Sequence, residues 1–125
     1  MNNLLLIFIG AGFGGVLRYW VSNGIYTLLG KQFPYGTLVV NVSGCFLMGL
    51  LFVLILERFN EVSSTLRALL LIGFLGGYTT FSSFSIETIN LFENGEWFNA
   101  TMNIVLSTVI CIVATLLGVI GGRSL

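Results

Sequence analysis

Four long apolar runs, separated by short polar segments, make up nearly the whole chain. They cover about residues 4–29, 37–56, 68–91 and 98–120. A helix rises 1.5 Å per residue, so about 20 apolar residues cross the hydrocarbon core of a bilayer. The pattern predicts an all-α membrane protein, with four transmembrane helices in one domain over residues 1–125 and both termini on the same side.

The third run is interrupted near its middle. From Gly73 to Phe84 it reads GFLGGYTTFSSF, so glycines, hydroxyls and aromatic rings replace aliphatic side chains. Peptide groups exposed to hydrocarbon cost several kcal/mol each, so a break at membrane depth needs surrounding protein or a wet path. We predict a broken third helix, with the break at about residues 76–79. It is either a functional site or a glycine kink whose hydroxyls bond to the preceding turn.

Composition supports a membrane protein and excludes several functions. The chain is 56% hydrophobic and 8% charged, with zero net charge and a mean hydropathy of +1.00. A soluble domain needs about a quarter of its residues charged. No run of Lys or Arg indicates a nucleic-acid partner, and without histidine nothing supports an enzyme. Cys45 and Cys111 are interpreted as small core residues.

One face of the first run carries Gly10, Gly14, Arg18 and Ser22 at every fourth residue. Small residues at this spacing let another helix approach closely. Arg18 needs a separate account, because a guanidinium within a span is costly. It either extends to the interface or attracts anions to a water-filled vestibule.

Polar residues also follow one face of the second and fourth runs. Thr37, Asn41 and Cys45 share a face, and the two N–H donors of the Asn41 amide suit either a neighbouring helix or a dehydrated anion. The fourth run has a residue of this kind at every fourth position: Asn99, Asn103, Ser107, Cys111 and Thr115. Such a stripe is either a seam between helices or the polar rail of a pore.

The basic residues nearly balance across the membrane. Arg58, Arg67 and Arg123 belong to the side of the termini, while Lys31 and the more ambiguous Arg18 belong to the other. Because basic residues set orientation, the preference for one topology is weak. Four helices with so few polar residues cannot enclose a useful channel, so we expect an oligomer.

Three motifs together resemble one family. They are GGVLRY at 14–19, GTLVVN at 36–41 and GGYTTFSSFSIE at 76–87. In length, span number and motif order the whole chain is similar to the Fluc (CrcB) family of microbial fluoride ion channels. The resemblance implies a homodimer in the cell (inner) membrane whose subunits insert in opposite orientations, an antiparallel dual-topology dimer. It also implies two fluoride pores and a structural sodium ion at the dimer centre.

The resemblance implies roles for individual residues. Asn41 would line the pore, Phe81 and Phe84 would form its aromatic anion sites, and Ser107 would lie on a polar rail. Fluoride is small and tightly hydrated, so a pore must replace its water with amide and hydroxyl donors and positively polarised ring edges. The predicted pore residues are Asn41, Phe81, Phe84, Ser82, Ser107, Thr37 and Arg18.

The sodium ion would bind to the backbone carbonyls of Gly76 and Thr79, as the resemblance implies, because a hard cation prefers oxygen ligands. The family often has a non-aromatic residue at the position of Tyr78. Glu87, which follows the break, has no assigned role.

The leading hypothesis is a passive fluoride-selective channel that exports cytoplasmic fluoride and lowers its toxicity. A small proton-coupled multidrug exporter would share the span number, but such exporters resemble one another in a first-span glutamate, where the only charge here is Arg18. A non-transporting membrane assembly protein would need the glycine faces but not the Thr-Thr-Phe break.

Overall fold

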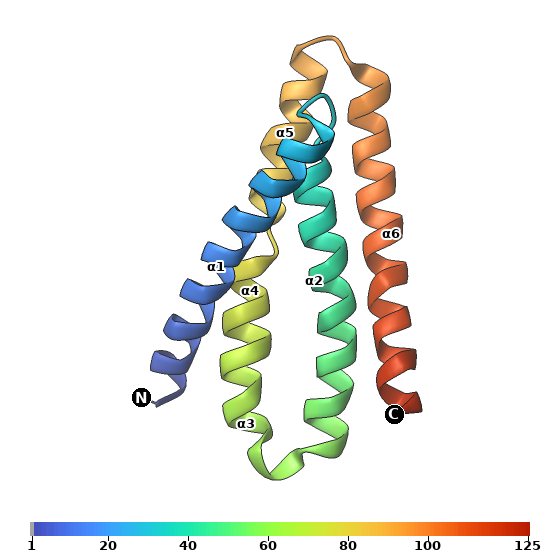
Figure 1. The fold of residues 1–125 in the computed structure, drawn as a ribbon. Helices are drawn as coiled ribbons and strands as arrows, with labels where there is room; N and C mark the ends of the chain where they lie inside the picture. Colours follow the sequence, from blue (N-terminus) through green and yellow to red (C-terminus); the bar gives the residue numbers. More distant parts are fainter. Residues whose placement is uncertain (1) are drawn as a thin grey trace.

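The computed structural model describes residues 2–125, apart from the side chains of Asn2 and Asn60. In this part of the chain, four helical segments are long and apolar enough to cross a membrane: Asn3–Leu29, Tyr35–Arg58, Ser63–Glu93 and Trp97–Ser124. The second, third and fourth spans lie roughly along one direction, the first is inclined to them, and both termini are at the same end of the bundle (Figure 1). The prediction of an all-α protein with four long apolar helices is confirmed.

The second and third spans are each composed of several helical elements. In chain order the elements are α1 (Asn2–Leu29), α2 (Tyr35–Val53), the π-helical η1 (Leu54–Arg58), the 3₁₀ turn η2 (Asn60–Val62), α3 (Ser63–Leu66), the π-helical η3 (Arg67–Leu75), α4 (Gly76–Tyr78), α5 (Phe81–Glu93) and α6 (Trp97–Ser124). Two sharp connections use glycine at positive φ, Gly30 at +87° and Gly95 at +80°, where other residues would be strained.

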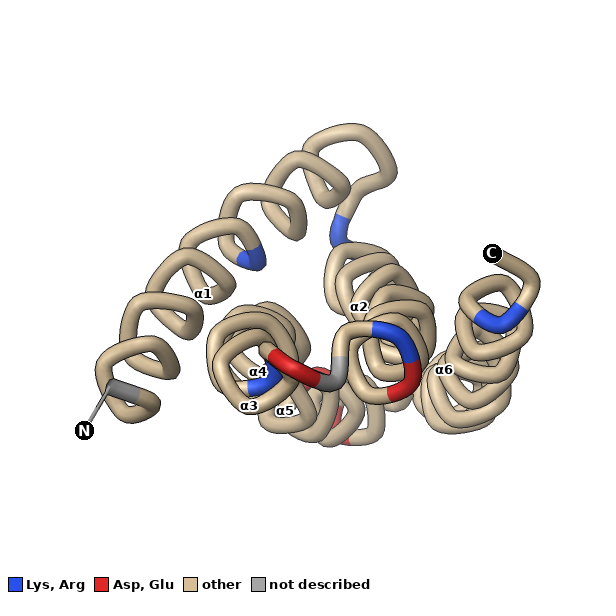
Figure 2. The backbone as a smooth tube through the Cα atoms, turned by 90° about the horizontal axis from the view of Figure 1, so that it is seen from below, with Lys and Arg blue, Asp and Glu red and all other residues tan. Residues whose placement is uncertain are grey.

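The polar segment over residues 57–67, which separates the predicted second and third spans, is mostly helical. Phe59 alone separates η1 from η2, and its N–H donates to the Leu54 carbonyl at 3.1 Å. Helical turns satisfy the backbone groups of this short connection internally, which an irregular loop would leave to water. Figure 2 shows charged positions on the connection between the second and third spans and near the C-terminus, with one basic position along α1.

The outer helices α1 and α6 flank the second and third spans (Figures 1 and 2). The face of α1 that carries Gly10 and Gly14 packs against η3 and α4. A Cβ atom added to Gly14 would overlap the Phe74 carbonyl oxygen, and one added to Gly77 would lie 2.9 Å from the Ala11 Cα. The predicted close approach of another helix to this glycine face is confirmed.

A second close approach joins α2 to α6, which lie side by side in the same direction (Figure 1). Cβ atoms added to Gly49 and Gly118 would overlap the carbonyl oxygens of Thr115 and Phe46. The backbones therefore touch where these glycines lie, as small residues permit in membrane helices.

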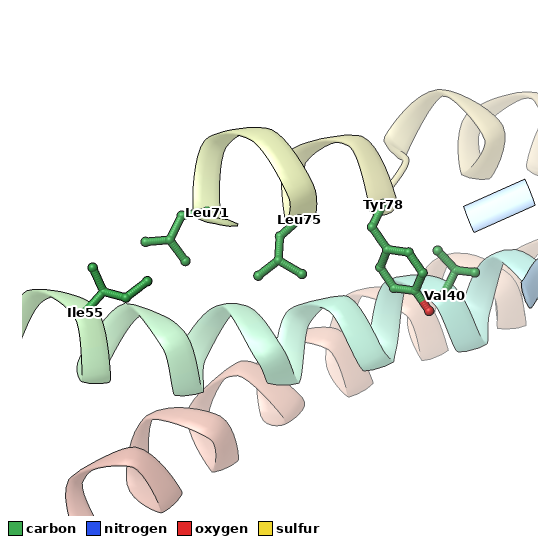
Figure 3. Packing of buried hydrophobic residues seen from close by; sticks show 5 residues of the cluster. All are labelled: Val40, Ile55, Leu71, Leu75 and Tyr78. Carbon is green, nitrogen blue, oxygen red and sulfur yellow. The ribbon is translucent and has the colours of Figure 1, made fainter. Parts of the chain in front are cut away.

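Between α2 and the first half of the third span lies a small apolar core (Figure 3). Its buried members are Val40, Ile55, Leu71, Leu75 and Tyr78. Figure 3 shows the Tyr78 ring directed towards α2 beside Val40. The Tyr78 hydroxyl lies 2.9 Å from the Ser43 hydroxyl oxygen. The resemblance to the Fluc family implied no role for Tyr78. In the structure Tyr78 is a core residue with a hydrogen-bonded hydroxyl.

The backbone is extended at Thr79 and Thr80, with φ/ψ of −82°/155° and −149°/119°. Gly76, Gly77 and Tyr78, which the sequence placed within the interruption, are helical as α4. The helical pattern persists up to Thr79 because its N–H still donates to the Leu75 carbonyl at 3.0 Å. Of the residues in the predicted break at 76–79, only Thr79 is therefore extended.

Candidate functional site

A cavity of about 330 Å³ lies beside the extended residues, between α2, α5 and α6. Its lining is made of polar, aromatic and sulfur-containing residues and one isoleucine: Asn41, Cys45, Thr79, Thr80, Phe81, Phe84, Ser107, Thr108, Cys111 and Ile112. None of these residues is charged. The cavity brings together Asn41, Phe81, Phe84 and Ser107 from the predicted pore set.

Asn41 binds both backbone groups of Thr80. Its Oδ1 accepts from the Thr80 N–H at 2.8 Å, and its Nδ2 donates to the Thr80 carbonyl at 2.9 Å. This pair links α2 to the extended segment and replaces hydrogen bonds that a helix would have made. It uses one of the two Nδ2 hydrogens, so the amide retains a second donor. Asn41 can therefore bond to the neighbouring segment and still donate to an anion, so the two interpretations from the sequence are compatible.

Phe81 and Phe84 lie on the first turn of α5. Thr80 caps that helix, since its Oγ1 accepts from the Ser83 N–H at 3.1 Å. The two ring centroids are 5.4 Å apart with an interplanar angle of 46°, and 78% of Phe81 is exposed. Tilted rings at this spacing present their positively polarised edges in different directions. By capping α5, Thr80 fixes where this helix starts and therefore where Phe81 and Phe84 lie.

Ser107 lies on α6 at the end of a chain of polar side chains. Its Oγ donates to the Asn103 Oδ1 at 3.3 Å, and the Asn103 Nδ2 donates to the Thr88 Oγ1 at 2.8 Å. Thr88 donates in turn to the Phe84 carbonyl at 2.7 Å. The polar stripe of the fourth span is therefore a seam between α6 and α5 at Asn103 and part of the cavity wall at Ser107.

Two backbone carbonyls of the third span, those of Gly76 and Thr79, lose the donors that a continuous helix would supply. In a helix, Gly76 would accept from the Thr80 N–H and Thr79 from the Ser83 N–H. Those N–H groups donate instead to the side chains of Asn41 and Thr80. The carbonyl oxygens of Gly76 and Thr79 are hard ligands of the kind that alkali and alkaline-earth cations accept.

Arg18 binds the last turn of α4. Its Nε donates to the Gly77 carbonyl at 3.1 Å, which joins α1 to the third span. A cation at a helix C-terminus interacts favourably with the helix dipole. Arg18 is therefore engaged inside the bundle, next to the extended segment, and does not line the cavity.

Thr37 and Ser82 lie outside the cavity lining. Thr37 is buried, and its Oγ1 lies 3.3 Å from the Tyr26 hydroxyl, which donates to the Glu87 Oε2 at 2.7 Å. Ser82 is exposed, with its hydroxyl 3.3 Å from that of Thr80. Glu87 thus closes a polar cluster between α1, α2 and α5, and its Oε1 is buried without a partner among the described residues.

Several lining residues are not among the predicted site residues. They are Cys45, Thr80, Thr108, Cys111 and Ile112. Fourfold spacing places Cys45 with Asn41, and Cys111 with Ser107, and this periodicity was the available signal. Nothing in the sequence indicates that Thr108 and Ile112 also face the cavity, because that depends on how α6 is rotated against α5.

The fold and the cavity define a class of protein: a small, multi-pass membrane protein with an uncharged polar and aromatic site at the middle of its third span. The chain belongs to the CrcB family, because the family model described as "CrcB-like protein, Camphor Resistance (CrcB)" matches residues 5–119.

Curated relatives of the chain share one name, fluoride-specific ion channel FluC. The protein from Coxiella burnetii (strain Dugway 5J108-111) is 61% identical over 123 residues, which is 98% of this chain and 99% of the relative. The Geobacter sulfurreducens protein is 46% identical over 125 residues, the full length of both chains. The Methylococcus capsulatus protein is 49% identical over 98% of this chain, which covers 54% of that longer relative.

Proposed function

We propose that the protein is a passive, fluoride-selective ion channel that exports cytoplasmic fluoride. The observation that carries the proposal is the composition of the cavity wall, where Asn41, Phe81, Phe84 and Ser107 meet without a charged residue. Amide and hydroxyl donors and ring edges can replace the hydration of a small anion, while a fixed positive charge would hold it too tightly for passage. Membership of the CrcB family and the names of its relatives support the same function.

The working unit is an antiparallel, dual-topology homodimer in the cell membrane. A cavity on the side of one subunit is open on one face, so a second subunit is needed to close a pore around it. Thr79 and Thr80 then form the break of the third helix, which lies at the midplane and meets the equivalent break of the partner. Asn41, Phe81, Phe84 and Ser107 line the pore, while Thr37, Ser82 and Arg18, which were predicted with them, lie outside the cavity wall.

A structural sodium ion binds at the dimer centre to the carbonyls of Gly76 and Thr79. The two oxygens fit this role because side chains have taken the N–H groups that would otherwise donate to them. Gly76 is exposed and Thr79 partly buried in the single chain. A subunit interface that covered their carbonyls would leave them without partners, which is costly, and a cation there would satisfy them and stabilise the extended segment.

Purified protein in liposomes tests the proposed function. Liposomes loaded with potassium fluoride should release fluoride when an ionophore provides a potassium path, and liposomes loaded with potassium chloride should not release chloride. Equal release of both anions would exclude selectivity. Release that requires a proton gradient and no ionophore would favour the proton-coupled exporter, and no release of fluoride would favour the non-transporting assembly protein.

A further inference from the structure

Two thiols face the same cavity from neighbouring helices. Cys45 on α2 and Cys111 on α6 both line it, both are free and partly buried, and they are the two cysteines of the sequence. Family membership does not explain them as pore residues, because a thiol is a weak hydrogen-bond donor to an anion.

The packing of α2 on α6 places these cysteines at the same level. Gly49 lies against the Thr115 carbonyl, and the two helices have the same direction. Cys45 and Cys111 each precede these contacting residues by four, which is about one helical turn on the same face. Both residues also line the same cavity, between α2 and α6. The pair therefore forms a dithiol in the cavity wall, one turn from Asn41 and Ser107.

We propose that Cys45 and Cys111 form a two-coordinate site for soft, thiophilic metal ions, and that an ion bound there blocks the cavity. Soft thiolates select soft metals. In the described part of the chain, no group of three or more His, Cys, Asp or Glu side chains could hold a metal ion. A four-ligand zinc site is therefore not formed here, whereas an ion that prefers two thiolates needs no further ligand.

Binding is a ligand exchange without oxidation or reduction. A mercuric ion would form two S–Hg bonds and break two S–H bonds, and the two protons would leave to solvent. Two thiols held together act as a chelate, because the second bond forms at high effective concentration. Either thiol alone should therefore bind roughly 100-fold more weakly.

Mercuric ion is the probe for the experiment, with the thiols reduced beforehand and the reductant removed. Titration of the detergent-solubilised protein should show one ion bound and two protons released per chain. In liposomes, inhibition of fluoride release should saturate at the same ratio and be reversed by excess dithiothreitol. Inhibition of fluoride release rests on the proposed channel function, whereas mercury binding by the two thiols does not. A protein that binds mercury but releases no fluoride would therefore contradict the channel function and not the metal site.

Cys45→Ala, Cys111→Ala and the double variant are matched controls, each compared with its own flux before mercury is added. Each single variant should need roughly 100-fold more mercury for half-inhibition, and the double variant should bind none. Cys45→Ser and Cys111→Ser repeat the comparison if an alanine variant is poorly folded. Two ions bound per wild-type chain, or single variants as sensitive as the wild type, would overturn the dithiol site. Wild-type binding without inhibition would overturn the block.

Discussion

The side-chain amide of Asn41 pairs with both backbone groups of Thr80, across 39 residues of sequence. This pair anchors the extended segment of the third span to α2 at the wall of the cavity. One change of side chain can therefore test both the anchoring and the proposed passage of fluoride.

Asn41→Asp keeps the size of the side chain but replaces the Nδ2 donor by a second oxygen. The carboxylate would face the Thr80 carbonyl and an approaching anion, so we expect fluoride release to be abolished. The unpaired carbonyl should also lower the free energy of unfolding by about 1–3 kcal/mol. Fluoride electrode recordings and thermal unfolding measure the two effects.

Asn3→Asp is the control for this change, because Asn3 lies near the N-terminus, where its Nδ2 donates to the Ser64 hydroxyl at 3.4 Å. It should conduct fluoride as the wild type does. If Asn41→Asp conducts at neutral pH, Asn41 belongs to the helix seam alone.

Phe81→Ile and Phe84→Ile retain an apolar side chain but remove the polarised ring edge. Each should abolish or sharply slow fluoride release while the protein elutes at the size of the wild type. Phe13→Ile is the matched control, since Phe13 is 70% exposed on α1. Wild-type flux through both α5 variants would exclude the aromatic pair from the path.

Removal of sodium tests the proposed sodium ligands, the carbonyls of Gly76 and Thr79. A ligand that binds only the folded state raises its stability, so replacement of sodium by a large organic cation should lower the melting temperature and the rate of fluoride release. Re-addition of sodium should restore both in a concentration-dependent manner. A protein indifferent to the exchange in both measurements has no functional cation there.

Gly49→Ala tests the close approach of α2 and α6. The added Cβ atom would overlap the Thr115 carbonyl oxygen, and the helices must separate, which should cost about 1–3 kcal/mol of unfolding free energy. Gly24→Ala is the control, because a Cβ there has no neighbour within 4 Å, and it should change stability by less than about 1 kcal/mol. Equal melting temperatures for the two variants would show that α2 and α6 can separate at Gly49 without loss of stability.

The proposed dual topology can be tested by adding basic residues on one side of the membrane. The basic residues nearly balance across the membrane, so two lysines added beside Lys31 should force one orientation and abolish flux. Co-expression with a variant that carries two extra lysines beside Arg58 should restore it, because the two forms can pair antiparallel. A reporter at the wild-type C-terminus should be found on both sides of the membrane, and a reporter on one side only would mean that a separate partner is required.

The number of spans and the glycine faces could be predicted from the sequence because both depend on local properties. Hydropathy adds up along a run such as residues 98–120, and the spacing of Gly10 and Gly14 places them on one face in any regular helix. The position of the extended residues was harder to predict, since Gly76 and Gly77 lower helix propensity yet remain helical, with α1 packed against Gly77.

The sequence by itself determined that this is a four-span membrane protein and which polar and aromatic residues occur within its spans. Only the tertiary structure decided which of them meet: that Asn41 takes the Thr80 N–H, that Arg18 binds the Gly77 carbonyl, and that Cys45 and Cys111 line the same cavity. The physical reason is that periodicity defines the face of one helix, whereas the rotation and depth of one helix against another are decided by contacts between residues distant in sequence.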